Sequence, residues 1–258
     1  KTKPLNQFIL GILAGAFIAF ASEGSNMAAF NLFAKPETYG LGKALAGVVF
    51  ATGLMLVIIA GGELFTGNTL ITIGVLEKKI KLKDMLSNWF FVYLGNFVGA
   101  VFIAYMMNMS GLFNSGDNML GGITLKIAAY KTHLTFSQAF YLGIMCNWLV
   151  CIAVWMSYGA KDIIGKCFAI FFPISLFITS GFEHSIANMY YIPAGILAKS
   201  NASWVEASGL TAEKLAHLNW NTFITKNLVP VTIGNIVGGV ILVAGVSWFT
   251  YYKNSENA

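Results

Sequence analysis

The stretch GGELFTGN, residues 61–68, interrupts an apolar run that begins with VVFATGLMLVIIA at residues 48–60. It places three glycines, a carboxylate, a hydroxyl and an amide where a membrane-spanning helix would otherwise continue. Backbone that leaves a helix within lipid must be buried in protein or line a wet cavity, because its N–H and C=O groups need partners. Gly61, Gly62 and Gly67 are expected to permit the backbone angles of such a break. The stretch therefore predicts a broken helix that exposes polar groups to a pore.

A second stretch, SGFEHSIAN at residues 180–188, has the same character. In both stretches a glutamate is followed, after four residues, by an asparagine, so that Glu63 and Asn68 match Glu183 and Asn188. The sequence GNFVGA, which begins at residue 95, also resembles GNIVGG, which begins at residue 234. These matches predict two repeats of three helices each, over about residues 1–110 and 130–253. Because three is an odd number, the two copies must be inverted in the membrane, which indicates a transport site at the midplane.

The composition is that of a membrane protein. Of the 258 residues, 57% are hydrophobic and only 10% are charged, and the mean hydropathy is +0.69. A soluble globular chain carries about 25% charged residues. Because a helix needs about 20 apolar residues to cross the bilayer, the runs predict an all-α polytopic protein with six transmembrane helices, of which the second and fifth are broken. The predicted single transmembrane domain covers residues 1–258, with spans near 6–29, 44–74, 86–108, 137–159, 167–198 and 223–251.

Six spans put both termini on one side of the membrane, and the charges indicate which side. All sixteen basic residues are lysines, and the short loop EKKIKLKD, residues 77–84, holds four of them. Positively charged loops stay in the cytoplasm, so the sequence predicts a cytoplasmic-membrane protein with both termini in the cytoplasm. The net charge of +5 does not indicate nucleic-acid binding, because the lysines are scattered through short loops.

The sequence carries no sign of an enzyme. It lacks the nucleotide-binding, metalloprotease and serine-hydrolase motifs. Its three cysteines, Cys146, Cys151 and Cys167, have neither metal-ligand spacing nor a disulfide pattern. We therefore expect no cofactor, no metal and no catalytic residue. Transport should be passive or coupled to an ion.

Two residues at the breaks have side chains suited to a pore. His184 occupies the position that Leu64 holds in the first repeat, so the symmetry of the scaffold does not require it. Its neutral ring can donate a hydrogen bond, although a lone histidine is often a satisfied core residue. Thr66 can donate a hydroxyl proton across the same gap, or it can cap the helix that follows.

The other polar candidates have simpler interpretations. Glu63 and Glu183 are either ion ligands or acceptors for free backbone amides of the broken helices, and their symmetry favours the scaffold role. Asn147 and Asn235 are mid-span amides that either link helices or face a pore. Lys131 precedes the fourth span and is, without further information, a solvated loop lysine. The apolar residues near the breaks, which form either packed core or constrictions that gate a pore by dewetting, are Phe50, Leu54, Leu64, Phe65 and Phe177.

The chain resembles the formate/nitrite transporter family. The two stretches IIAGGELFTG (58–67) and GIMCNWLVCIA (143–153) match its signatures. The stretches SGFEHSIANM (180–189) and NLVPVTIGNIVGG (227–239) look like its fifth and sixth helices. The resemblance implies a homopentamer in the lipid bilayer, with an aquaporin-like pore in each protomer. It also implies passage of small monovalent weak-acid anions, namely hydrosulfide, formate and nitrite.

The resemblance assigns roles to individual residues. His184 and Thr66 match the central polar site, which Asn147 and Asn235 support, and Lys131 matches a lysine of the pore vestibule. The five apolar residues fall on constriction positions, and the sequence looks closest to the hydrosulfide-channel branch. Two alternatives stay open. One is a channel for neutral solutes such as ammonia, water or glycerol, although no Asn-Pro-Ala motif is present; the other is a membrane enzyme or quinone-site subunit.

Overall fold

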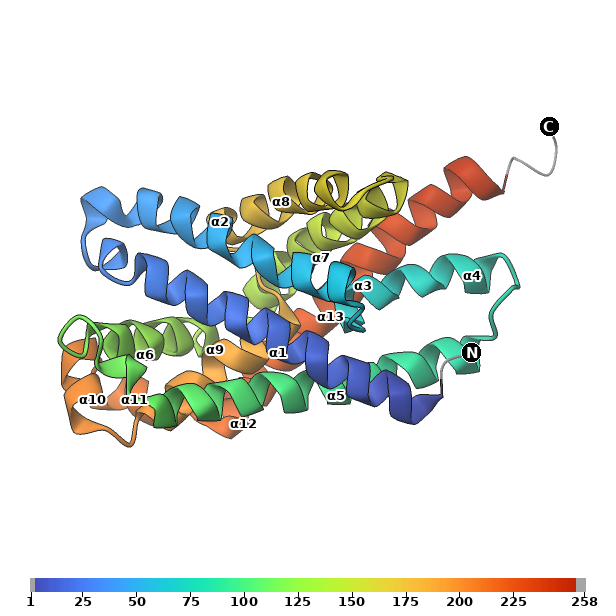
Figure 1. Cartoon of the computed structure of the whole chain (residues 1–258). Helices are drawn as coiled ribbons and strands as arrows, with labels where there is room; N and C mark the ends of the chain where they lie inside the picture. Colours follow the sequence, from blue (N-terminus) through green and yellow to red (C-terminus); the bar gives the residue numbers. More distant parts are fainter. Residues whose placement is uncertain (1–2, 254–258) are drawn as a thin grey trace.

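The structure, a computed structural model, describes residues 3–253, and all the regular secondary structure in that range is helical, with no strand among those residues (Figure 1). The ends of the predicted domain, residues 1–2 and 254–258, lie outside the described residues. In chain order the helices are α1 (Pro4–Ala29), η1 (Leu32–Ala34), α2 (Pro36–Ala60), α3 (Phe65–Asn68), η2 (Thr69–Ile71), α4 (Thr72–Leu76), α5 (Leu82–Ser110), η3 (Leu112–Asn114), α6 (Met119–Thr132), α7 (Phe136–Gly159), α8 (Ile163–Ser180), α9 (Ser185–Ala198), α10 (Ala202–Ser208), α11 (Ala212–His217), α12 (Trp220–Thr222), η4 (Phe223–Leu228), α13 (Val229–Val237), η5 (Gly238–Gly245) and η6 (Trp248–Tyr252).

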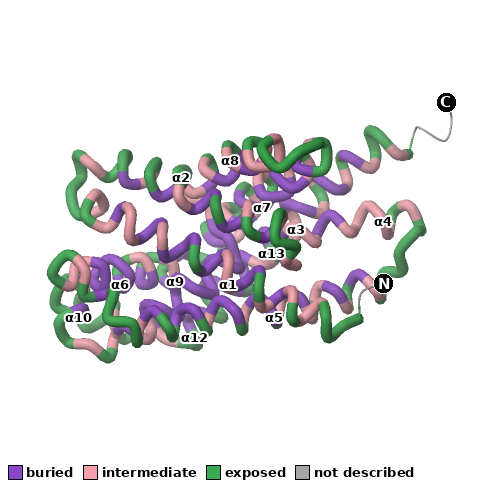
Figure 2. Tube along the Cα trace, viewed as in Figure 1, coloured by how far each residue is buried: buried purple, intermediate pink, exposed green. Residues whose placement is uncertain are grey.

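Six helices among the described residues are long and apolar enough to cross a membrane, as predicted. Five of them are α1, α2, α5, α7 and α8, and the sixth is the continuous helical segment Trp220–Tyr252, which contains π-helical stretches. Large apolar side chains such as Phe20, Phe90 and Phe172 are exposed on their outer faces. Buried residues lie along the inner faces and over most of α9 (Figure 2). This distribution is typical of a bundle whose solvent is lipid.

The structure adds elements that the sequence analysis did not assign. Between the third and fourth spans lies α6, and α10 and α11 follow α9. These three helices lie at one end of the molecule, whereas α1 begins and the last spanning helix ends at the opposite end (Figure 1). In addition, α2 begins at Pro36 rather than near residue 44, since proline suits the first helical turn and Glu37 favours the positive end of the helix dipole.

Both predicted breaks are present, and each begins at a glycine with positive φ. Gly61 has φ +83° and donates its N–H to Val57 O at 3.1 Å. Gly181 has φ +80° and ends α8 in the same way. The expectation for the other two glycines was wrong, because neither has a positive φ. Gly62 is needed for space, since a Cβ atom there would lie 3.0 Å from Ala14 Cβ, and Gly67 lies within α3.

The two repeats pack through the same close crossing. A Cβ atom on Gly95 would lie 2.3 Å from the carbonyl oxygen of Phe8, where α5 crosses α1. At the matching place, a Cβ atom on Gly234 would lie 2.2 Å from the carbonyl oxygen of Phe140, where α13 crosses α7. Since consecutive spans run in opposite directions, the first and fourth spans, α1 and α7, are antiparallel. The fold is therefore an inverted repeat held by two equivalent backbone contacts.

This contact predicts that Gly95→Ala destabilises the protein by about 1–3 kcal/mol, because the new methyl group collides with rigid backbone. Thermal unfolding of the purified protein in detergent measures the effect. Gly40→Ala is the matched control, since Gly40 is also helical and a Cβ atom there has no neighbour within 4 Å. Equal melting temperatures for the two variants would show that the crossing tolerates a side chain.

Candidate functional site

The two breaks meet at a hydrogen bond between Thr66 and His184. Thr66 Oγ1 lies 2.9 Å from His184 Nε2, although 118 positions separate the two residues. Thr66 is in the first turn of α3, directly after the first break, and His184 is the N-cap of α9, directly after the second. Both are buried, with exposed fractions of 0% and 3%. The structure thus brings together the two residues that the family resemblance assigns to a central polar site.

The second ring nitrogen of His184 determines which atom of the pair donates. His184 Nδ1 accepts the backbone N–H of Ala187 at 3.1 Å, so in the neutral ring the proton is on Nε2. Nε2–H therefore donates to Thr66 Oγ1. Among residues 3–253 no acceptor lies within bonding distance of the Thr66 hydroxyl proton, which leaves that proton available to a solute. Thr66 does not cap a helix, because neither α3, in which it lies, nor η2 and α4, which follow, has a side-chain cap.

Two asparagines hold the breaks by identical hydrogen bonds to backbone. The amide nitrogen of Asn96 donates to the carbonyl oxygens of Gly11 and Glu63 at 2.8 and 2.9 Å, and its oxygen accepts the N–H of Phe65 at 3.0 Å. Asn96 therefore satisfies the polar backbone that the first break leaves without helical partners.

Asn235 does the same at the second break. Its amide nitrogen donates to the carbonyl oxygens of Gly143 and Glu183 at 2.8 and 3.0 Å, and its oxygen accepts the N–H of Ser185 at 2.9 Å. Of the two interpretations of Asn235, these bonds match the link between helices. Asn147 links Thr66 to Asn235, since its amide nitrogen donates to the carbonyl oxygens of Thr66 at 3.2 Å and Asn235 at 2.7 Å.

The carboxylates accept side-chain amides rather than the backbone amides expected from the sequence. Glu63 accepts from Asn68 at 2.5 Å, and Asn68 also donates to Asn88 at 2.8 Å. Glu183 accepts from Asn188 at 2.6 Å in the same way.

In the second repeat Asn188 also donates to Asn227, at 2.7 Å, which completes the match with Asn88. The sequence analysis missed Asn88 and Asn227. The signal that would have found them is their equal spacing, because each precedes the matched asparagine, Asn96 or Asn235, by eight residues.

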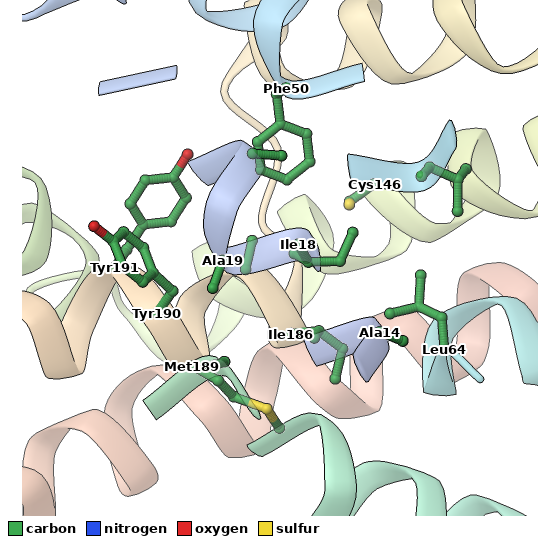
Figure 3. Close-up of a cluster of buried hydrophobic side chains, with 14 of the residues drawn as sticks. Ala14, Ile18, Ala19, Phe50, Leu64, Cys146, Ile186, Met189, Tyr190 and Tyr191 are labelled. Atoms are coloured by element: carbon green, nitrogen blue, oxygen red, sulfur yellow. The ribbon is translucent and has the colours of Figure 1, made fainter. Parts of the chain in front are cut away.

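The five apolar candidates are all buried in one hydrophobic cluster. The rings of Phe50 and Phe177 meet edge to face with centroids 5.5 Å apart, and the Phe177 ring lies 5.9 Å from that of His184. In this cluster Phe50 and Leu64 lie around residues of α1 such as Ile18 (Figure 3). Leu54 is 2% exposed. Phe65 belongs to the cluster too, and it packs its ring against those of Tyr93 and Trp89 of α5.

A cavity of about 530 Å³ lies beside the second break, between α1, α2, α6 and α8. Its wall includes Lys43, Lys126, Lys131 and Glu183. Lys131 Nζ forms an ion pair with Glu183 Oε1 at 2.6 Å, and it lies 5.2 Å from the ring centroid of Tyr191. The sequence analysis singled out Lys131 but missed Lys43 and Lys126, since no sequence pattern shows which neighbour a lysine within a helix faces.

Comparisons with known proteins identify the family of the chain. The family model described as "Formate/nitrite transporter" matches residues 1–249. "Formate channel FocA" of Escherichia coli (strain K12) is 40% identical over 257 residues, which cover 98% of this chain and 89% of that protein. "Formate channel FocA" of Haemophilus influenzae is 42% identical over 249 residues, covering 93% of this chain and 85% of that protein.

A solved structure described as "Pentameric formate channel with formate bound" is similar along nearly the whole length. Its TM-score is 0.88 at 40% identity, and the match covers 97% of this chain and 98% of that one. These relatives are channels and not enzymes. On the whole-length family match and on these identities, the chain belongs to the formate/nitrite transporter family.

Proposed function

We propose that the protein is a passive channel for small monovalent weak-acid anions, with formate as the leading substrate and nitrite and hydrosulfide as further ones. The observation that carries this proposal is the buried Thr66–His184 pair at the junction of the two breaks. The names of the similar proteins favour formate over the hydrosulfide suggested by the sequence. By the same likeness, the working assembly is a homopentamer in the cytoplasmic membrane.

The path runs from the cavity through the aromatic constriction to the central pair. The cavity collects anions, and the Phe50–Phe177 contact removes part of their water. The anion then meets two neutral donors, His184 Nε2–H and the Thr66 hydroxyl. Neutral donors suit a channel, because binding must be strong enough for entry and weak enough for release. Leu54 and Leu64 narrow the same path. Of the five predicted constriction residues, Phe65 is the least supported, because its ring contacts are to Tyr93 and Trp89 of α5.

The side of the membrane to which the cavity opens follows from its place in the helix bundle. The cavity lies among residues of α6 and the start of α2, at the end opposite to the one where α1 begins (Figure 1). With both termini in the cytoplasm, the cavity opens away from the cytoplasm.

A neutral-solute channel is the second candidate, because the central pair itself carries no fixed charge. Ammonia is the solute that a neutral histidine in an apolar passage fits best. The positively charged cavity argues against it.

Flux into liposomes that contain the purified protein tests the function. We expect formate, nitrite and hydrosulfide to cross faster than chloride or glycerol, and His184→Ala to lower the flux of these anions or change their ranking. If glycerol or ammonia crosses and the anions do not, the protein is a neutral-solute channel.

The Thr66 hydroxyl gives a sharper test with a matched control. Thr66→Val keeps the shape and removes the donor, so formate flux should fall about ten-fold, the typical cost of losing one buried hydrogen-bond partner. Thr66→Ser keeps the hydroxyl and should retain most of the flux. Equal flux through the valine and serine variants would remove the hydroxyl from the site.

The hydrogen bond from Ala187 N–H to His184 Nδ1 predicts that formate flux is not coupled to protons. A second proton on the ring would displace that N–H, so the histidine donates a hydrogen bond without releasing a proton. We therefore expect the reversal potential in a planar bilayer to follow the formate gradient and to ignore a pH gradient at fixed formate. A shift of the reversal potential with the proton gradient would establish coupling.

A further inference from the structure

The lysine singled out by the sequence is not a free charge. Lys131 Nζ and Glu183 Oε1 are 2.6 Å apart, and their side chains are only 12% and 2% exposed. Glu183 is itself fixed by the amides of Asn188 and Asn227. An ion pair held this closely presents little net charge to an anion that enters the cavity. Another group must supply the attraction.

Lys43 has the properties that Lys131 lacks. It lines the cavity from α2, and among residues 3–253 its ammonium has no hydrogen-bond or ion-pair partner. A Cβ atom built on Gly181 would lie 3.7 Å from Lys43 Nζ, so the charge sits at the second break. The carbonyl oxygens of Phe177 and Ile178, at the end of α8, already accept N–H groups of the turn that follows. The ammonium is therefore not used to cap that helix.

The position of Lys43 along α2 places it on the path. It precedes Phe50 by seven residues, which is two helical turns or about 10 Å along the axis. Residues at this spacing share a helix face, and Phe50 and Leu54 continue the same buried stripe. An anion beside Lys43 thus lies in the cavity about two helical turns from Phe50, on the same face of α2.

A second donor faces the same cavity from α1. Asn26 is 3% exposed, and its amide nitrogen has no partner within bonding distance among the described residues. The neighbouring Ser25 donates to the carbonyl oxygen of Ala46 at 3.0 Å, which fixes α1 against α2 one turn from Lys43. A buried amide without a partner is costly, and an anion in the cavity would supply the missing acceptor.

We propose that Lys43 and Asn26 form an anion-binding site in the cavity, for a monovalent carboxylate or oxoanion of the size of formate or nitrite. The site concentrates the anion outside the Phe50–Phe177 constriction, whereas Lys131 serves mainly to neutralise and hold Glu183. The inference rests on the proposed function and names the residues that set the apparent affinity of the channel. Other charged or titratable groups on the cavity wall are Tyr39, Lys126, Tyr130, Lys131, Glu183 and Tyr191.

The test is the dependence of flux on formate concentration, in liposomes at low ionic strength. Lys43→Met should raise the half-saturating formate concentration about ten-fold, in the lower part of the range seen for charged clefts. The maximal flux should change little, because the central pair is intact. Lys43→Arg, which keeps the charge, should restore the half-saturating concentration and also shows that position 43 tolerates substitution.

Two controls separate this site from general surface charge and from the ion pair. Lys35→Met removes an exposed lysine at the start of the same helix, outside the cavity, and should leave the half-saturating concentration unchanged. The double variant Lys131→Met with Glu183→Gln removes both charges of the pair and should shift that concentration less than Lys43→Met does. Added salt should weaken formate affinity in the native protein more than in Lys43→Met.

The outcomes distinguish the inference from the function on which it rests. The proposed site is wrong if Lys43→Met has the same half-saturating formate concentration as the native protein. It is also wrong if the double variant shifts that concentration more than Lys43→Met does. If the native protein itself carries no anion flux, it is the proposed function that fails. Loss of maximal flux in Lys43→Met that arginine does not restore would show that Lys43 has a structural role, and the proposal would be wrong.

Discussion

The amide of Asn96, and that of Asn235 in the other half, replaces the hydrogen bonds that each broken helix gives up. Each side chain uses both of its polar atoms on backbone groups, two carbonyl oxygens and one N–H, and each is fully buried. Without these bonds, polar backbone at membrane depth would lack partners, at a cost of several kcal/mol for each group. The breaks, the cavity beside one of them and the Thr66–His184 pair all depend on these side-chain hydrogen bonds, which take the place of helical ones.

The scaffold is symmetric but the chemistry is not. The glycine turns, the asparagine bonds and the glutamate–asparagine pairs occur in both repeats. His184 has Leu64 as its counterpart, and the ion pair of Glu183 with Lys131 has no equivalent at Glu63 among residues 3–253. The two halves of the pore therefore differ in polarity, although they share one architecture. The shared residues support the two breaks, whereas His184 and the ion pair are found at the second break alone among the described residues.

Much of this organisation was predictable from the sequence because it is local or repeated. The breaks follow from glycines and carboxylates within apolar runs, and the repeats follow from the recurrence of Gly-Asn and of glutamate followed by asparagine. The proximity of Thr66 and His184 was not derivable in this way, since it depends on how two distant helices meet; the family resemblance supplied it. Lys43 was missed for the same reason, because no spacing along α2 reveals which neighbour its ammonium faces. The neutralisation of Lys131 likewise required the position of α6.

The two ring nitrogens of His184 have different partners, and this limits which replacements position 184 can accept. Its Nδ1 accepts an N–H in the first turn of α9 while its Nε2 bonds to Thr66, so a replacement at this position alters the start of a helix together with the contact between the two breaks. Thr66 caps no helix and carries no such second duty. A replacement of the Thr66 side chain therefore leaves every helix start as it is, whereas a replacement of His184 also removes the N-cap of α9. Position 184 is thus tied to the fold of the second break in a way that position 66 is not tied to the first.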